Sequence, residues 1–188
     1  MADGNGTFKL ATREEVVERI KKEHDLTGAD LTGIDLAGVK FTNLRMAGAQ
    51  LTNANLANAT FAGAEMKEVD LSGANLDSAT LAGVNLQGAA LPGAHLTSAK
   101  FTGVNLSDAN LTGADLTGSR LMAVNVHGAD FTDALTADSK AAAVDWQSAK
   151  VPPAELPATV PPPPPWVPAV ILGGVLLLVF LLLRRRRA

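Results

Sequence analysis

Residues 29–33 read A-D-L-T-G, residues 109–113 read A-N-L-T-G, and residues 114–118 read A-D-L-T-G again. They are copies of one five-residue unit that runs between them without insertion or deletion. In steps of five from Leu26, all 22 positions through Phe131 are apolar, and 15 of them are Leu. A helix of period 3.6 cannot keep such a set on one face, and a strand of period 2 would alternate it between faces. The period of five therefore predicts a solenoid.

Each unit has the pattern of a short strand followed by a corner. Two residues before each large apolar position lies a small one, from Ala29 to Ala129, and 13 of these 21 residues are Ala. The position between the two is polar, with Asp or Asn at 12 of 22 sites. Gly dominates two residues after the large apolar position, where a turning chain needs positive φ. The alternation of inward and outward residues predicts a strand of about three residues per unit.

Longer spacings indicate how many units close one coil. Phe41, Phe61 and Phe101 are separated by multiples of 20, and Val84, Val104 and Val124 are 20 apart. Four units per coil would stack these like residues on parallel strands. The 22 units then form five and a half coils, about 26 Å long at a strand spacing of about 4.8 Å.

These units resemble the pentapeptide-repeat family, whose repeat has the form A(D/N)LXX. The resemblance covers about residues 25 to 134. It implies an all-β solenoid of one kind, a right-handed quadrilateral parallel β-helix. In such proteins the motif residues are structural, so the resemblance says little about function.

Both ends of the repeat region, residues 26–135, need covers that protect the open ladder. Within residues 1–25, Thr12 and Glu15 form a capping box, and Val16, Val17 and Ile20 form the apolar stripe of a short capping helix. At the other end we expect residues 136–150 to form a C-terminal cap. Its covering side chains would be Ala142, Ala143 and Trp146.

Residues 151–165 form a proline-rich linker. Nine of the ten prolines lie between Pro152 and Pro168, and residues 161–165 are all Pro. Such a run adopts polyproline II and acts as a semi-rigid spacer. The alternative is a ligand for a domain with an aromatic groove.

Residues 166–183 predict a single transmembrane helix. All 18 are apolar, and a helix of that length spans about 27 Å, close to the hydrocarbon thickness of a bilayer. Trp166 would lie at one membrane interface and the basic tail, residues 184–188, at the other. The cations of that tail are Arg184, Arg185, Arg186 and Arg187.

The membrane side of the rod is open to two interpretations. Four arginines after the helix favour a cytoplasmic C-terminus and a rod outside. Residues 1–25 carry eleven charged side chains and no signal peptide, which favours a tail anchor with a cytosolic rod, and this is our expectation. A third interpretation takes Leu156-Pro157-Ala158-Thr159-Val160 and the following residues as a bacterial sorting signal that is cleaved. Val160 stands there in place of the Gly of that signal.

No catalytic template fits the sequence. The chain has no Cys and lacks the HExxH, Walker A and GxSxG motifs. The histidines are His24, His95 and His127, and four-unit coils place the last two on different faces, so they cannot share a metal. We therefore predict no enzyme activity, no metal, no cofactor and no small-molecule substrate.

The net charge of −3 includes the four tail arginines, so residues 1–183 carry about −7 and no basic stripe for nucleic acid. We expect a non-catalytic, membrane-anchored scaffold that presents a flat face to an unidentified protein. The candidate interaction face holds Lys40, Lys100 and Arg120, opposite a column with Asp30 and Asp130. The family resemblance also implies an alternative, a DNA mimic that binds topoisomerases; residues 26–135 carry a net charge of about −5.

Overall fold

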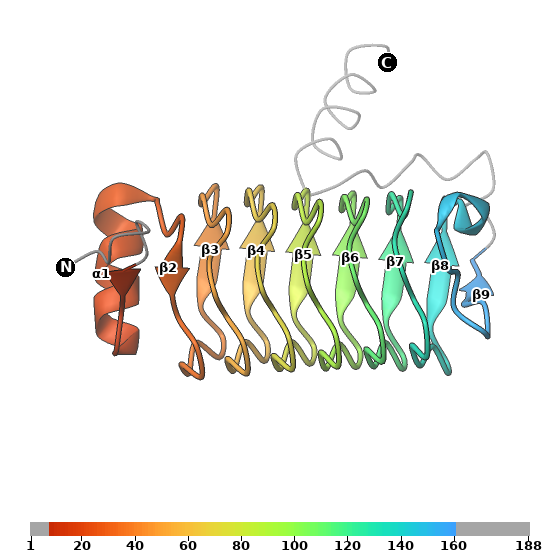
Figure 1. The fold of residues 1–188 in the computed structure, drawn as a ribbon, viewed down its shortest axis with the longest axis horizontal. Helices are drawn as coiled ribbons and strands as arrows, with labels where there is room; N and C mark the ends of the chain where they lie inside the picture. Colours follow the sequence, from red (N-terminus) through yellow and green to blue (C-terminus); the bar gives the residue numbers. More distant parts are fainter. Residues whose placement is uncertain (1–7, 161–188) are drawn as a thin grey trace, which may run out of the picture.

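The structure is a computed structural model, and it describes residues 8–160. The chain forms a straight rod of stacked coils, with one helix at its N-terminal end (Figure 1). The elements are β1 (Phe8–Lys9), α1 (Arg13–Glu23), β2 (Ala29–Asp30), β3 (Lys40–Thr42), β4 (Thr60–Ala62), β5 (Thr80–Ala82), β6 (Lys100–Thr102), β7 (Arg120–Met122), β8 (Lys140–Ala142), the 3-10 helix η1 (Trp146–Ser148) and β9 (Ala158–Thr159).

One face of the rod is a parallel sheet of seven strands in the order β3 to β9. From β3 to β8 each strand pairs with the next in a register of 20 residues, so that Phe41 faces Phe61 and Phe61 faces Leu81. The predicted coil of four units is thereby confirmed. The chain completes a full circuit between successive strands, which makes the molecule a parallel β-solenoid.

The other three faces are connected by single bridges with the same register. Asp25 pairs with Arg45, Asp30 with Gln50 and Asp35 with Asn55, and each series continues along the rod in steps of 20. The backbone N–H of the residue after each bridge also donates to the next coil, as from Leu31 to the Gln50 carbonyl at 2.7 Å. Every face is therefore held in register by backbone hydrogen bonds.

The two apolar columns fill the inside of the coils. Side chains of the large column are almost completely buried, including Phe41, Phe61, Phe101 and Phe131. The Ala and Val residues of the small column are buried beside them. Because successive like residues stack, the core is one continuous cluster along the rod.

The corners adopt the left-handed conformation that the Gly pattern predicts. Gly93 has φ +63. Because Gly has no side chain, it adopts this conformation without steric strain. Asn58 takes the same conformation with φ 60 at an equivalent corner. Asn tolerates this region better than other residues with a side chain, which explains why it can replace Gly there.

The N-terminal helix covers the first coil, as expected. Thr12 and Glu15 form the predicted capping box, and Val16 is fully buried. Two arginines join the helix to the rod: Arg13 Nη2 donates to the Ala37 carbonyl at 2.9 Å, and Arg19 Nε donates to the Asp25 carbonyl at 3.1 Å. Backbone carbonyls of the first coil thus gain partners from the cap.

The ladder continues past residue 135, where the repeat region was expected to end. Strand β8 adds a further rung, with Ala141 buried in the large apolar column. Trp146 then packs edge-on against Phe131, with ring centroids 5.4 Å apart. Ala143, expected to cover the last coil, is exposed instead.

The first ten residues of the expected linker also belong to the rod. Pro153 and Pro157 are buried, and the Phe131 N–H donates to the Val151 carbonyl at 2.8 Å. The chain then returns to β8 as β9, where the Ala158 N–H donates to the Ser139 carbonyl at 3.0 Å. The docked segment pairs with backbone groups at the open end of the ladder and buries two proline rings. Residues 151–160 are therefore not a free spacer. Residues 161–165 lie outside the described part of the chain.

The predicted transmembrane helix, residues 166–183, also lies outside the described residues, as do Trp166 and the arginines of residues 184–187. Between residues 8 and 160 no helix is long and apolar enough to cross a bilayer.

Candidate interaction face

The outward side chains of the rod form four straight columns, one on each face. The basic column runs along strands β3 to β8; its members are Lys40, Thr60, Thr80, Lys100, Arg120 and Lys140. The acidic column lies half a coil away, on the opposite face; its members are Asp30, Gln50, Asp70, Ala90, Asn110 and Asp130. Between them lie the amide column, with Glu65, Asn85, Asn105 and Asn125, and the histidine column, with Asn75, His95 and Asp115.

The structure places the three predicted residues of the interaction face, Lys40, Lys100 and Arg120, in the basic column. They are not evenly grouped, because the strands with Thr60 and Thr80 separate Lys40 from the other two. Lys140 follows Arg120 in register on β8 and was not among the predicted residues. Three of the four cations therefore form a cluster on adjacent strands; they are Lys100, Arg120 and Lys140.

The cations of this column have no carboxylate partner within the described part of the chain. Ion pairs there involve other cations, among them Arg45 with Asp25 at 2.6 Å and Lys150 with Asp130 at 3.1 Å. The side chains of Lys40, Lys100, Arg120 and Lys140 are exposed. This face thus presents free positive charge to solvent.

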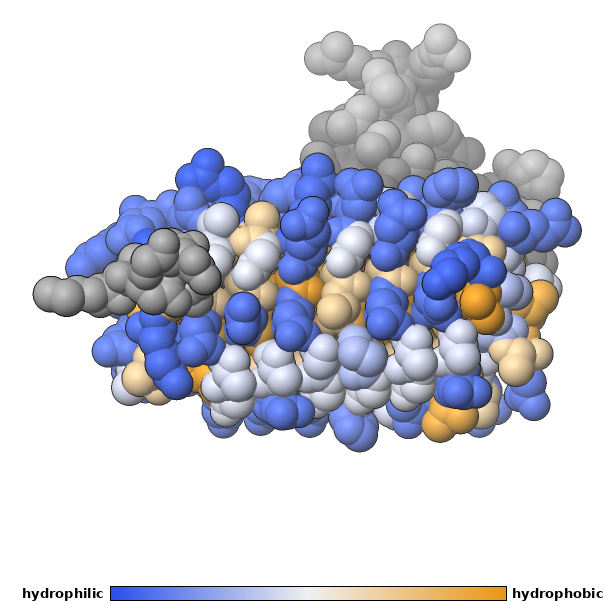
Figure 2. Space-filling model, viewed as in Figure 1, coloured by the Kyte–Doolittle hydropathy of each residue, from blue (hydrophilic) through white to orange (hydrophobic). Residues whose placement is uncertain are grey.

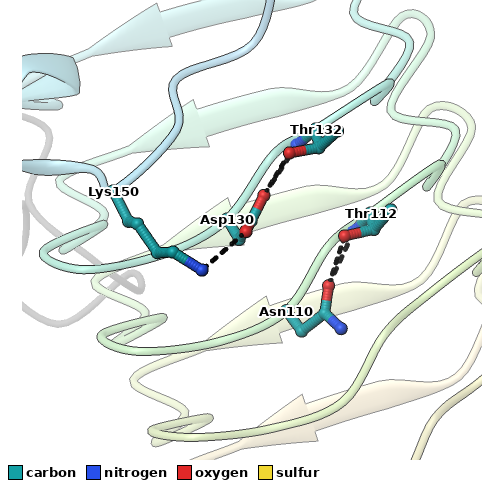
Figure 3. Close-up of polar contacts among 5 residues, drawn as sticks. All are labelled: Asn110, Thr112, Asp130, Thr132 and Lys150. Carbon is teal, nitrogen blue, oxygen red and sulfur yellow. Dashed lines mark hydrogen bonds and ion pairs between the residues drawn. The ribbon is translucent and has the colours of Figure 1, made fainter.

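The Asp and Asn side chains of the acidic column are held in a fixed conformation by hydrogen bonds from the following corner. Asp130 Oδ1 accepts from the Thr132 backbone N–H at 3.0 Å and from the Thr132 hydroxyl at 2.6 Å (Figure 3). Asn110 Oδ1 accepts the same pair of bonds from Thr112, one coil earlier. The oxygens on this face are therefore ordered before any partner binds.

These hydrogen bonds keep the carboxylates charged. The Thr132 hydroxyl and N–H, with the Lys150 ammonium, lower the pKa of Asp130 to about 2. The Thr32 N–H and hydroxyl lower the pKa of Asp30 in the same way. For Asp70, burial raises the pKa, but hydrogen bonds from Ser72 and Thr52 outweigh it and the net shift is downward. The face is negative at any pH near neutrality.

The amide column satisfies its own hydrogen bonds. Asn85 Nδ2 donates to Glu65 Oε1 at 2.9 Å, Asn105 donates to Asn85 at 3.1 Å, and Asn125 donates to Asn105 at 2.9 Å. Each amide uses a partner 20 residues away, so the series forms a ladder along the rod. This ladder stabilises the stack along the rod.

The histidines lie apart, as the sequence indicated. His95 is exposed in the histidine column between Asn75 and Asp115, and His127 is exposed at a corner after the amide column. No group of three His, Asp or Glu residues within residues 8–160 could hold a metal ion.

The C-terminal half of the basic column borders a small apolar area. Arg120, Met122, Lys140 and Val160 line a hollow on the surface of strands β7 to β9. The hollow lies beside the point where the described chain ends, at Val160.

Lys140 could have been found from the sequence by one signal, its spacing of 20 from Arg120. The large apolar position of its unit is occupied by Ala141, and that of the preceding unit by Thr136, so the pattern of large apolar residues ends at Phe131. The structure shows that both residues are buried in the same column. The smaller side chains mark the end of the apolar pattern but not the end of the rod.

The sequence profile of pentapeptide repeats matches the chain in eight copies, over residues 25–57, 45–82, 79–118 and 99–135. No curated protein matches the sequence.

Solved structures with the same architecture include full-length QnrB1, a plasmid-mediated fluoroquinolone resistance protein. It has a TM-score of 0.56 and 16% identity, over 78% of this chain and 82% of QnrB1. Rfr23, a pentapeptide repeat protein from the cyanobacterium Cyanothece 51142, has a TM-score of 0.45 and 25% identity, over 69% of this chain and 96% of Rfr23. At 16% identity the likeness to QnrB1 establishes the fold alone.

Proposed function

The chain belongs to the pentapeptide repeat family, and from that premise we propose that it is a non-catalytic, membrane-anchored scaffold for protein interactions. The rod supplies rigid, flat faces, and the apolar run of residues 166–183 supplies the anchor. The basic column, with Lys40, Lys100 and Arg120, is an interaction face.

The observation that carries the proposal is the opposite charge of two opposite faces. The basic column carries free cations, whereas the acidic column carries carboxylates fixed by Thr132 and equivalent residues. Charged faces of opposite sign orient a rod between two neighbours of different charge. A rod that is capped at both ends and hydrogen-bonded on every face keeps those faces at constant spacing.

The anchor rests on composition. Residues 166–183 have the length and hydropathy of a membrane span, with Trp166 and the arginines at 184–187 suited to the two interfaces. Because β9 is docked on the rod, five prolines at 161–165 are the main spacer between the rod and the span. Five residues of polyproline II extend about 16 Å. The rod would therefore stay close to the bilayer, on its cytosolic side.

A non-catalytic role agrees with the shape of the described surface. Apart from Arg120 and Lys140, which line the hollow beside Val160, the outward side chains of the columns project from the faces of the rod, whereas catalytic groups act in concave sites that exclude water. The lowered pKa of Asp130 comes from local hydrogen bonds of a corner, which are repeated along the column. That repetition is typical of a structural role.

The other two functions fit these observations less well. A DNA mimic requires a continuous acidic track, and the free cations of the basic column interrupt one face. A sorting signal requires residues 156–160 to enter a protease in extended form, whereas Pro157 is buried and Ala158–Thr159 pair with β8. Cleavage there would require β9 to leave the rod.

Membrane fractionation and protease accessibility test the anchor and its orientation. With a tag at Met1, the full chain should resist alkaline extraction, and the tag should be protected in intact cells and digested after lysis. Digestion in intact cells would place the rod outside. A mature C-terminus that ends between residues 156 and 160, found by mass spectrometry, would replace the anchor with a sorting signal.

Photocrosslinking from each face tests the scaffold. A crosslinking residue is introduced at Thr60, Asn85, Gln50 or Asn75, one position in each column, and exposed to light in intact cells. A scaffold should yield the same protein adduct from one or two columns only. Equal yields from all four columns would indicate collisions with bystanders and would contradict the proposal.

A further inference from the structure

Three cations of the basic column stand on adjacent strands without compensation. Lys100 faces Arg120 and Arg120 faces Lys140 in direct register, on strands about 4.8 Å apart. Like charges directly opposite each other destabilise a sheet. Within residues 8–160 no carboxylate lies within ion-pair distance of any of the three.

Elsewhere the rod pairs its stacked cations. Arg45 contacts Asp25, its bridge partner one coil away, and Lys150 contacts Asp130 from the position before Val151, the bridge partner of Asp130. In the basic column the residue one coil before Lys100 is Thr80. An Asp or Glu at that position could have paired with Lys100, but Thr80 carries no charge. The cluster is therefore suited to an anionic surface outside the rod.

Exposed apolar side chains gather at the same end of the molecule. The large hydrophobic side chains that are exposed within the described residues are Met122 (39%), Leu135 (57%), Leu156 (59%) and Val160 (36%), all in the last coils. Hydrophobic residues reach the surface at the β8–β9 end in Figure 2. Met122 and Val160 line one hollow together with Arg120 and Lys140, so cations and apolar groups form one mixed patch.

The described part of the chain also ends at this patch. Val160 belongs to the hollow, and residues 161–165 connect it to the apolar run that begins at Trp166. If residues 161–165 form the predicted polyproline II spacer, the six steps from Val160 to Trp166 span about 19 Å, and a bilayer that holds residues 166–183 would lie within that distance of Val160. The patch is the part of the rod that such a bilayer reaches first.

We propose that the mixed patch docks on the anionic lipid headgroups of the bilayer that anchors the chain. Lys100, Arg120 and Lys140 contact the headgroup phosphates, and Met122 and Val160 lie at the level of the headgroups. This inference rests on the proposed anchor and names the partner of the basic column. The acidic column then faces away from the membrane, because the same lipids repel its carboxylates.

The expected strength of docking follows from the number of cations. One Lys or Arg near an anionic surface strengthens binding about fivefold, so three favour the docked rod by about a hundredfold over the undocked one. Salt should weaken this preference, because the Debye length falls from about 10 Å at 0.1 M to about 3 Å at 1 M.

Two fluorescent probes on opposite faces test the docking. The chain has no Cys, so Thr80→Cys labels the basic column and Ala90→Cys labels the acidic column in the same coil. The full chain is reconstituted into vesicles of phosphatidylcholine, with or without about 30% phosphatidylglycerol. A quencher is attached to a small fraction of the headgroups.

We expect the probe at position 80 to be quenched several-fold more than the probe at position 90 in the anionic vesicles, and the difference to vanish in high salt. The variant K100Q/R120Q/K140Q should abolish the difference. The control K21Q/K22Q/K67Q also removes three exposed cations, two on α1 and one on the rod, and should retain the difference. Equal quenching of the two probes in anionic vesicles, with the chain still in the membrane, would overturn the docking.

Flotation separates this inference from the proposed function. The full chain should float with pure phosphatidylcholine vesicles, because the anchor needs no lipid charge. Failure to float there would overturn the anchor and the proposal that rests on it. The variant Val160→Cys tests whether a second copy occupies the patch instead. Disulfide crosslinks between two copies, without quenching of the probe at position 80, would assign the patch to a second chain and overturn lipid docking.

Discussion

Phe41 stacks on Phe61 in the next coil, with ring centroids 4.6 Å apart and ring planes only 7° apart. Aromatic pairs adopt either stacked or edge-on arrangements. Here the backbone register of β3 and β4 imposes the parallel arrangement, since residues 20 apart lie directly above each other. The pair shows how the coil length converts a spacing in the sequence into a contact in the core.

Phe61 is expected to be one of the most sensitive positions of the rod, because it is fully buried between Phe41 and Leu81. Phe61→Ala should lower the free energy of unfolding by about 3 to 5 kcal/mol, measured by urea denaturation. Phe61→Leu should cost much less, since Leu81 already occupies the next rung. Thr60→Ala on the outer face should stay within about 0.5 kcal/mol of the original. Equal losses for the two changes at Phe61 would contradict a stacked core.

The period of the sequence predicts contacts that repeat and misses those that do not. The spacing of Phe41, Phe61 and Phe101 predicts the parallel register, because every coil imposes the same steric demand on its neighbour. The docking of residues 151–160 has no period. It follows from the need to cover one open end, which Pro153 and Pro157 do with their buried rings. The sequence alone marked these prolines as a spacer.

The same distinction between repeating and non-repeating contacts applies to the interaction face. Lys100 and Arg120 follow from the coil length, whereas Lys140 lies where Ala141 has replaced the large apolar residue and the repeat is hard to recognise. The hollow beside it also depends on Val160, which reaches β7 and β8 only because β9 returns to the sheet. Contacts made by a returning segment cannot be derived from the period.

Ser119 occupies a position of the small apolar column and buries its hydroxyl without a hydrogen-bond partner among the described residues. Ser139, one coil further on, donates its hydroxyl to the Thr136 carbonyl at 2.6 Å. Ser119→Ala should therefore raise the free energy of unfolding by about 1 kcal/mol. Ser139→Ala, the matched control, should lower it or leave it unchanged. Urea denaturation of both variants measures the contrast, and a loss of stability for Ser119→Ala would indicate an unseen partner.

Gly93 should tolerate Asn far better than Val. Its φ is +63, and a Cβ added there would meet no other atom within 4 Å, so backbone conformation alone decides the cost. Gly93→Val should cost about 1 to 2 kcal/mol or more, because a β-branched residue is rare at positive φ. Gly93→Asn should cost less, as Asn58 adopts this conformation at an equivalent corner. Thermal denaturation of the two variants should rank them in that order, and the reverse order would exclude backbone strain as the cause.

Asp130 makes the stability of the last coils depend on pH. Its pKa falls from 3.8 to about 2 in the folded chain, first through the hydroxyl and N–H of Thr132 and then through Lys150. Folding thus favours the ionised form. The resulting stabilisation is complete above the ordinary pKa of 3.8 and is lost as the pH falls through about 2.

The variant Asp130→Asn measures this contribution, because the substituted amide keeps an acceptor for Thr132 but has no charge for Lys150. The original chain should have the higher thermal midpoint near neutral pH, and the difference should shrink between about pH 4 and pH 2. Asn110→Ala is the control: it removes the equivalent bonds to Thr112, and Asn does not titrate, so its effect should not vary with pH. If the difference between the original chain and the Asp130→Asn variant persisted unchanged to about pH 2, hydrogen bonding alone, and not the carboxylate charge, would stabilise this corner.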